Sequence, residues 1–155
     1  DLELHLPFRF YRYELIEQDF GHGKWRGGTS AVREYAFLTP AQVTTESERH
    51  EDIDPPPGAF GGTPGRPGRF YKVQADGTRV KMYSKENAFQ FAPGDRLLIE
   101  GVTSGGYGDP KERDPERVLD DYLDDLISLE QAEGIYGVRI VEDRIDEAAT
   151  AALRG

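Results

Sequence analysis

Residues 71–83 have the sequence YKVQADGTRVKMY, in which Asp76-Gly77 separates two stretches that alternate between apolar and polar residues. Asp-Gly is a favoured centre of the two-residue type I′ turn, because both turn positions need a positive φ. With that turn, Val73 is expected opposite Val80, so that the apolar residues share one face. The stretch therefore predicts a β-hairpin and an antiparallel sheet around it.

Three further stretches have the aromatic and branched composition of strands. Residues 8–17, FRFYRYELIE, alternate but change parity between Phe10 and Tyr11. This change predicts a β-bulge at that point or a strand buried on both faces. Residues 31–38 and 96–102 are expected to form two more strands. Together with the hairpin they predict an antiparallel sheet or a barrel.

The last third of the chain has the pattern of helices. Asp114-Pro115 combines an N-cap with a first-turn proline, and apolar residues then recur at three- and four-residue spacing over 118–127. Ser128 and Gln131 form a capping-box pattern, and residues 146–154 predict a final helix. The fold class expected is α+β: mainly antiparallel β, barrel-like or an open sheet, with Gly/Pro-rich loops and a short helical C-terminal tail.

The composition of the chain changes near residue 109. The 155 residues include 18 Gly and 10 Pro, a share above the roughly 12% of average proteins. Fifteen of the glycines lie between residues 21 and 108. The net charge also differs between the two parts: it is −2 over residues 1–108 and −8 over residues 109–155. We therefore expect two parts, a Gly-rich β portion over 1–108 and an acidic helical segment over 109–155.

Several functional classes are excluded by composition. The chain has no Cys, which excludes disulfide scaffolds, thiolate zinc sites, iron–sulfur clusters and cysteine catalysis. The formal charge of −10 argues against nonspecific binding to nucleic acid or anionic membranes. The sequence shows neither a membrane-length apolar run nor an N-terminal signal pattern, so we expect a cytoplasmic protein.

Two polar features are candidates for binding sites. Residues 20–28, FGHGKWRGG, place His22, Lys24 and Arg26 among glycines whose N–H groups are accessible, so an anion such as phosphate or carboxylate can dock there. The alternative is a tight connection whose basic residues face water. The acidic residues of the 118–127 helix are instead expected to form a solvated face, because a convex helix splays metal ligands apart; they are Asp120, Asp121, Asp124 and Asp125.

Residues 50–68, HEDIDPPPGAFGGTPGRPG, show no periodicity. A loop of this length inside a compact domain is typically a binding loop or disordered, and a plain surface loop is the third alternative. The sequence contains no complete catalytic constellation and no metal-ligand pattern, so no catalytic residue and no metal ligand is assigned.

Three blocks of the sequence, in order, resemble the C-terminal end of the hydantoinase B/5-oxoprolinase family. The blocks are RYEL at 12–15 with DFGHGKWRGG at 19–28, then DG at 76–77 with SK at 84–85 and PGD at 93–95, then SGGYGDP at 104–110 with RDPE at 113–116. The structural motif of the resemblance consists of Gly27, Gly28, Gly105, Gly106, Tyr107, Gly108, Asp109 and Pro110. The glycine runs of the family are interrupted here by Phe20, His22 and Thr103-Ser104. Members of the family are several times longer than this chain.

The resemblance implies ATP-dependent chemistry on cyclic amides or ketones. Proteins of this family open hydantoins, 5-oxoproline or lactams, or carboxylate acetone or acetophenone. A partner of the hydantoinase A type, with a kinase fold, binds ATP and phosphorylates the substrate, and the B-type component then directs attack by water or carboxylate. ATP and a divalent metal are expected in the partner subunits, and no cofactor is expected on this chain.

The resemblance implies that this chain is a small subunit or C-terminal segment of a hydantoinase B-like component of a hetero-oligomer, and that it is inactive alone. Its partners would be the hydantoinase A-like kinase subunit and the remainder of the B-type subunit, with neither nucleic acid nor membrane. The alternatives are a subunit of an acetone- or acetophenone-type carboxylase and a non-catalytic assembly module. Candidate anion or substrate contacts are His22, Lys24, Arg26 and, from the SK pair, Lys85.

Overall fold

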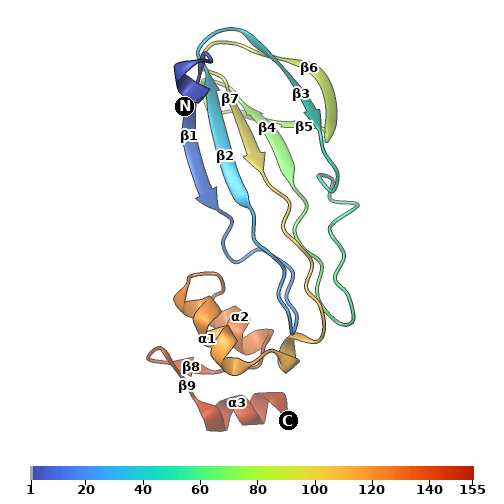
Figure 1. Cartoon of the computed structure of the whole chain (residues 1–155), viewed down its shortest axis with the longest axis vertical. Coiled ribbons are helices and arrows are strands. Elements are labelled where there is room, and N and C mark those ends of the chain that lie inside the picture. The colour runs from blue at the N-terminus through green and yellow to red at the C-terminus, as the bar shows by residue number, and fades with distance from the viewer. Residues whose placement is uncertain (1) are drawn as a thin grey trace. The chain divides into compact units, whose positions relative to one another are not determined.

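The computed structural model of the chain describes residues 2–155 (Figure 1). They form two compact units whose segments alternate along the sequence. Unit 1 contains the residues up to Ile16, Ser30–Pro55 and Pro67–Val102, and unit 2 contains Glu17–Thr29, Pro56–Arg66 and Thr103–Gly155. The boundary expected at residue 109 stays a prediction about domains; the compact units group two glycine-rich stretches with the C-terminal helices.

Unit 1 is built from two antiparallel sheets. The larger has the order β1 (Phe8–Leu15), β2 (Ala31–Phe37), β7 (Arg96–Glu100), β4 (Arg69–Val73), β5 (Arg79–Met82), and the smaller pairs β3 (Ala41–Glu46) with β6 (Lys85–Phe91). A short 3-10 helix, η1 (Leu2–Leu4), precedes β1. The larger sheet is open, with β1 and β5 at its edges, so the α+β class is confirmed in its sheet form and not as a barrel.

The core of unit 1 lies between the two sheets. Phe70, Met82 and Leu97 of the larger sheet are buried together with Phe91 of β6. Partly buried side chains of β2, β3 and β6 pack around them. Because β3 and β6 supply one wall of this core, the two strands that the sequence did not predict are essential to it.

The β1 strand contains the expected bulge. Its pairing with β2 shifts between Phe10 and Arg12, which leaves Tyr11 as the extra residue. The change of parity in the sequence is therefore explained by a bulge, and the prediction is confirmed.

The hairpin of β4 and β5 is confirmed, but its expected register is wrong by one residue. Val73 pairs with Arg79, and Lys72 pairs with Val80. The amide of Gly77 donates to Gln74 O, and of the turn residues only Gly77 has a positive φ, of 91°. The loop therefore has three residues with glycine in the left-handed position, whereas a type I′ turn would have two.

The helices of unit 2 follow their caps. They are η2 (Pro110–Glu112), α1 (Pro115–Leu123), α2 (Leu129–Gly134) and α3 (Glu147–Arg154), with a small hairpin of β8 (Ile140–Val141) and β9 (Arg144–Ile145) before α3. Asp114, Ser128 and Asp146 cap α1, α2 and α3 with their side chains, as the sequence predicted.

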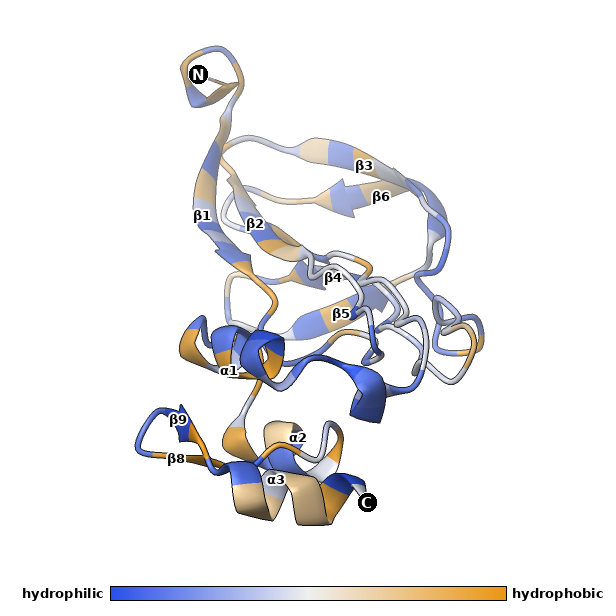
Figure 2. Cartoon of the chain, turned by 60° about the horizontal axis from the view of Figure 1, so that its bottom comes forward, coloured by the Kyte–Doolittle hydropathy of each residue, from blue (hydrophilic) through white to orange (hydrophobic). Residues whose placement is uncertain are grey.

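One apolar core joins α1, α2 and the hairpin of β8 and β9. Figure 2 shows hydrophobic bands between hydrophilic ones along α1, as in an amphipathic helix. The buried members of this core are Phe20, Val118, Ile127, Ala132, Tyr136, Val138 and Ile140. No helix within residues 2–155 is both long enough and apolar enough to cross a membrane.

Three extended segments form the rest of unit 2: residues 20–28, 56–66 and 103–108. None contains a helix or a strand longer than a single bridge, yet each is hydrogen-bonded to the other two. Gly21 N donates to Ser104 O at 2.9 Å, Thr63 N to His22 O at 2.8 Å, and Gly106 N to Thr63 O at 2.9 Å. We call this arrangement the glycine bundle.

The glycine bundle requires glycine because its backbones touch directly. A Cβ atom on Gly27 would overlap the carbonyl oxygen of Ser104, and one on Gly106 would overlap that of His22. Similar overlaps with backbone atoms occur at Gly21, Gly23, Gly58, Gly62, Gly65 and Gly105. The second half of the predicted 50–68 loop is thus hydrogen-bonded and closely packed within unit 2, although it has no regular secondary structure.

The neighbours Gly27 and Gly28 provide a matched test of this packing. We expect Gly27→Ala to lower the free energy of unfolding by about 3 kcal/mol, because the backbone of residue 104 must move. Gly28→Ala should change it by less than about 0.5 kcal/mol, because the nearest atom to the new Cβ is Ser104 Oγ at 3.8 Å. Chemical denaturation measures both variants, and equal losses would contradict the backbone contact.

Candidate functional site

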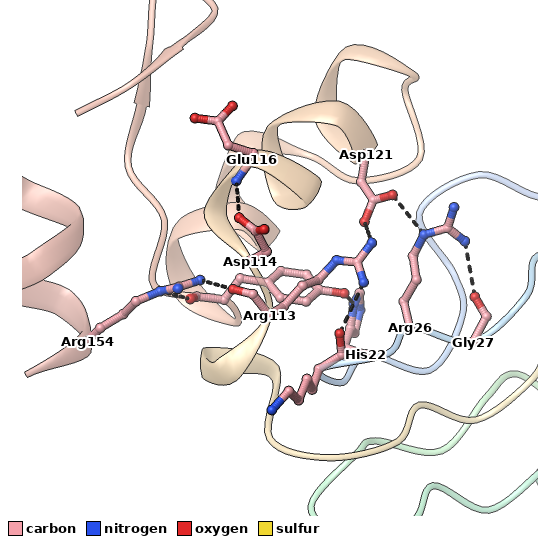
Figure 3. A network of polar contacts seen from close by, with 10 residues as sticks. His22, Arg26, Gly27, Arg113, Asp114, Glu116, Asp121 and Arg154 are labelled. Atoms are coloured by element: carbon pink, nitrogen blue, oxygen red, sulfur yellow. Dashed lines mark hydrogen bonds and ion pairs between the residues drawn. The ribbon is translucent and has the colours of Figure 1, made fainter. Parts of the chain in front are cut away.

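A buried carboxylate lies at the centre of a polar network in unit 2 (Figure 3). Asp121 of α1 forms one ion pair with Arg26 Nε at 2.8 Å and another with Arg113 Nη2 at 2.8 Å. The side chains of Asp121 and Arg113 are each 7% exposed, whereas that of Arg26 is 26% exposed. One carboxylate therefore pairs with two guanidinium groups. The three side chains, the Arg26–Asp121–Arg113 group, carry an excess of positive charge.

The burial of Asp121 corrects one part of the expected solvated acidic face. Asp120, Asp124 and Asp125 are exposed as expected. Asp121 lies three residues after Val118, which is fully buried, so the helix turns its side chain toward the interior. The two arginines then compensate for the lost hydration of the carboxylate.

Arg26 is held by three contacts. Besides Asp121, its Nη1 donates to Gly27 O at 3.2 Å, and its guanidinium lies over the Phe20 ring, 5.2 Å from the ring centroid. Both Gly27 and Phe20 belong to the same extended segment as Arg26. The glycine bundle thus fixes the position from which the guanidinium reaches α1.

His22 is buried beside Tyr136. Its Nδ1 lies 2.8 Å from the Tyr136 hydroxyl, and the amide of His22 donates to Thr63 Oγ1 at 2.7 Å. Burial lowers the pKa of His22 although Asp19 and Asp121 act in the opposite direction. Burial also raises the pKa of Tyr136. Both rings are therefore uncharged near neutral pH, and this pair is not a charged contact for an anion.

Arg113 and Arg154 connect the network to the last helix. Arg113 Nη1 donates to Lys24 O at 3.2 Å, while Arg154 donates to Arg113 O at 2.8 Å and to Tyr136 O at 3.1 Å. Arg113 Nε has no hydrogen-bond partner among residues 2–155. Burial lowers the pKa of Arg154. These bonds join η2, α1 and α3 to the segment that carries His22.

The two lysines of the prediction lie elsewhere. Lys24 is in unit 2, where its Nζ lies 3.1 Å from Glu112 Oε2 at the surface. Lys85 belongs to unit 1, and its Nζ lies 3.0 Å from Glu48 Oε1. A hydrogen bond from Lys85 to Glu48 raises the pKa of the lysine. Each of the four predicted residues thus has a partner within its own unit. Anion contact by any of them stays a prediction.

The residues of the predicted glycine motif have distinct structural roles. Gly105 and Gly106 are internal to the glycine bundle, and Tyr107 forms a β-bridge with Trp25. Gly108 has a φ of 77°, a left-handed conformation that favours glycine. Asp109 then caps η2, which begins at Pro110.

A cavity of about 370 Å³ lies near the network, within unit 2. It is lined by Asp114, Pro115, Glu116, Ile145, Glu147, Thr150, Ala151 and Arg154. Within the described part of the chain, no three His, Asp or Glu side chains are placed to hold a metal ion. The cavity and the network were not predicted, because no motif marks residues that converge from separate segments.

The fold and these segments define a member of a known enzyme family. A family model described as Hydantoinase B/oxoprolinase matches residues 1–110. The chain therefore belongs to the hydantoinase B/oxoprolinase family, as the resemblance of its sequence motifs implied.

Similar proteins cover almost all of the chain. It is 38% identical over 157 residues to a protein of Pseudomonas sp. (strain NS671) named as the B-type component of a D-/L-hydantoinase, and the match covers 99% of this chain and 26% of that protein. It is 32% identical over 158 residues to the beta chain of the caprolactamase of Pseudomonas jessenii, again over 99% of this chain and 27% of that protein. The chain thus spans about a quarter of the length of these relatives.

Solved structures agree with this assignment. The crystal structure of the ATP-dependent caprolactamase from Pseudomonas jessenii matches 98% of this chain and 27% of its own, with a TM-score of 0.74 and 29% identity. An acetone carboxylase in its nucleotide-free form matches 98% of this chain and 25% of its own, with a TM-score of 0.70. At 23% identity, the acetone carboxylase supports the fold alone.

The double ion pair of Asp121 predicts a large cost for its removal. We expect Asp121→Asn to lower the free energy of unfolding by about 3–5 kcal/mol, because the buried Arg113 and the partly buried Arg26 lose the anion that they share. The matched control is Asp120→Asn, whose carboxylate is exposed one residue earlier on the same helix and should change stability by less than about 0.5 kcal/mol. Equal effects of the two variants would contradict the network.

The buried His22 predicts that acid weakens the protein. The pKa of His22 is lower in the folded than in the unfolded state, so the unfolded chain binds more protons below pH about 6.5. The free energy of unfolding is therefore expected to be level well above that pH and to fall as the pH drops through it toward 5.5. His22→Gln should remove this dependence, whereas His5→Gln, at an exposed position, should retain it. A pH dependence that is unchanged in His22→Gln would contradict the assignment.

Proposed function

We propose that the chain is part of the B-type component of an ATP-dependent complex that opens cyclic amides through a phosphorylated substrate. The observation that carries this proposal is the match of nearly the whole chain to the B-type component of a hydantoinase and to the beta chain of a caprolactamase. Hydantoins and caprolactam are both cyclic amides, so the two relatives point to one substrate class.

Phosphorylation gives this reaction a chemical reason. Transfer of the γ-phosphoryl group of ATP to the amide oxygen makes the amide carbon more electrophilic, so that water adds to it. The C–N bond of the ring then breaks, its nitrogen takes up a proton, and a second water releases phosphate from the resulting acyl phosphate. In the proposal, ATP and a divalent metal are bound by a hydantoinase A-like kinase subunit, and this chain binds neither. The complex is then a hetero-oligomer in which this chain alone is inactive. A cytoplasmic location stays a prediction.

The role proposed for this chain is to hold the segment of residues 20–28 for contact with an anionic substrate. The surplus positive charge of the Arg26–Asp121–Arg113 group supports it, since Arg26 is the most exposed of the three. Lys24 lies two residues earlier with its ammonium at the surface. His22 supports this segment through its bond to Tyr136 and is a positioning residue.

Two alternatives remain as proposals. A ketone carboxylase is favoured by the fold shared with acetone carboxylase. A non-catalytic assembly module is favoured by the internal pairing of each candidate cation, because Arg26, Lys24 and Lys85 all have carboxylate partners. The cyclic amidase is preferred because the relatives with the higher identity are named for cyclic amides.

An ATPase assay tests the proposal. The complex that contains this chain is purified from its source, and its release of ADP from ATP is measured. We expect hydantoin, 5-oxoproline or caprolactam to stimulate ADP release, with stoichiometric formation of the opened product. Stimulation confined to acetone or acetophenone with bicarbonate would replace the amidase by the carboxylase. No stimulation by either class would contradict both.

The same assay separates a substrate contact from an assembly role. Lys24→Gln in the assembled complex should raise KM roughly tenfold, as expected for the loss of a charged hydrogen bond to an anionic substrate. Lys111→Gln is the control, because Lys111 is another exposed lysine of unit 2 and its ammonium donates to Leu153 O. Unchanged KM and kcat in Lys24→Gln would favour the assembly module.

A further inference from the structure

The bulge in β1 aligns apolar side chains that the sequence would otherwise divide between two faces. The pairs are Phe8 with Phe37, Phe10 with Tyr35, Tyr13 with Arg33, and Leu15 with Ala31. The four β2 partners are two residues apart and therefore lie on one face of the sheet. Their β1 partners lie on that face too, because the extra residue at Tyr11 restores the parity. We call these four β1 side chains the β1 row.

The β1 row continues the apolar core of unit 1 beyond the part that β3 and β6 cover. Phe8 and Phe10 pack against Tyr35, with ring centroids 5.7 and 4.7 Å apart, and Tyr35 in turn borders the core beneath β3 and β6. Farther along the strand this protection is lost: Phe10 is 37%, Tyr13 72% and Leu15 61% exposed. Figure 1 shows β1 at the edge of its sheet, away from β4 and β5.

Two cavities lie along the row. One, of about 290 Å³, is lined by Leu2, Phe8, Tyr35 and Phe37, and the other, of about 310 Å³, by Tyr13, Glu14, Leu15 and Ala31. Both are lined mainly by apolar side chains, and both belong to unit 1. An exposed apolar surface with such depressions at the edge of a sheet is typical of a surface that another polypeptide covers.

The charge beside the row specifies what must cover it. Arg33 lies opposite Tyr13 on the same face, is exposed, and has no ion-pair partner among residues 2–155. No carboxylate belongs to the row itself. A covering surface must therefore be apolar and carry an acidic group for Arg33. A second copy of this chain, packed row against row, would bring Glu14, but that carboxylate already forms an ion pair with Arg12 Nη1 at 3.0 Å.

We propose that the β1 row is the docking surface for the portion of a hydantoinase B-type protein that lies outside these 155 residues, whether on the same polypeptide or on another. This inference rests on the proposed function. The length of the relatives supports it, because nearly three quarters of each relative has no counterpart in this chain. The covering segment packs apolar side chains over Tyr13 and Leu15 and places a carboxylate against Arg33.

Photo-crosslinking in the assembled complex tests this surface. A benzoylphenylalanine replaces Tyr13 in the protein produced in its source, and Tyr83, which is 68% exposed and outside the row, is the control position. We expect the Tyr13 probe to crosslink to a peptide of hydantoinase B-type sequence outside residues 1–155, and the Tyr83 probe to miss that peptide. Crosslinks only to a kinase-type subunit, only to another copy of this chain, or to no peptide at all would overturn the proposal.

A pair of substitutions supplies a second measurement. Leu15→Lys should increase the amide hydrogen exchange of residues 8–15 in the complex at least tenfold, because the covering segment no longer packs. Leu38→Lys, at an exposed leucine outside the row, should leave that exchange unchanged. Equal exchange in the two variants would overturn the docking surface.

The two proposals fail in distinguishable ways. ADP release with cyclic amides, together with crosslinks only to a kinase-type subunit or to another copy of this chain, would remove the docking surface and keep the function. The expected crosslink without ADP release on any cyclic amide would remove the proposed chemistry and keep the surface.

Discussion

Direct contact between backbones in the glycine bundle is the constraint on which the rest of unit 2 depends. Gly27 and Gly106 allow carbonyl groups to lie where a side chain would otherwise stand, and lateral hydrogen bonds then join three segments that are far apart in sequence. The same packing orients His22 toward Tyr136 and Arg26 toward Asp121. The polar network is thus a consequence of glycine packing, and it fastens the bundle to the helices.

Features governed by neighbouring residues could be predicted from the sequence. The caps at Asp114 and Ser128 depend on one side chain and an amide two or three residues away, and the bulge at Tyr11 leaves its mark in the parity of one strand. The hairpin at Gly77 was predicted, but its predicted register was wrong by one residue. Asp-Gly fits both a two-residue and a three-residue loop, and the difference depends on pairing along the whole hairpin.

Features that depend on distant segments could not be predicted. Residues 85–91 begin with the polar stretch Lys85-Glu86-Asn87, so β6 has no clear alternation, and it becomes a strand because it completes a core. The burial of Asp121 required knowledge that Arg113 and Arg26 face it from other segments. The glycine bundle has no sequence period, although the excess of glycine marked the segments that form it. His22 and Arg26 were singled out as candidate anion contacts, which stays a prediction, and their partners Tyr136 and Asp121 were not predicted.

The three segments of the glycine bundle are held together by backbone hydrogen bonds at close contact. Native-state amide hydrogen exchange tests this arrangement most directly, at the amides of Gly21, Thr63 and Gly106, which donate across the bundle. The account predicts that these amides exchange as slowly as those in the middle of α1, because they open only when unit 2 unfolds. Exchange at the rate of an unstructured peptide would contradict it.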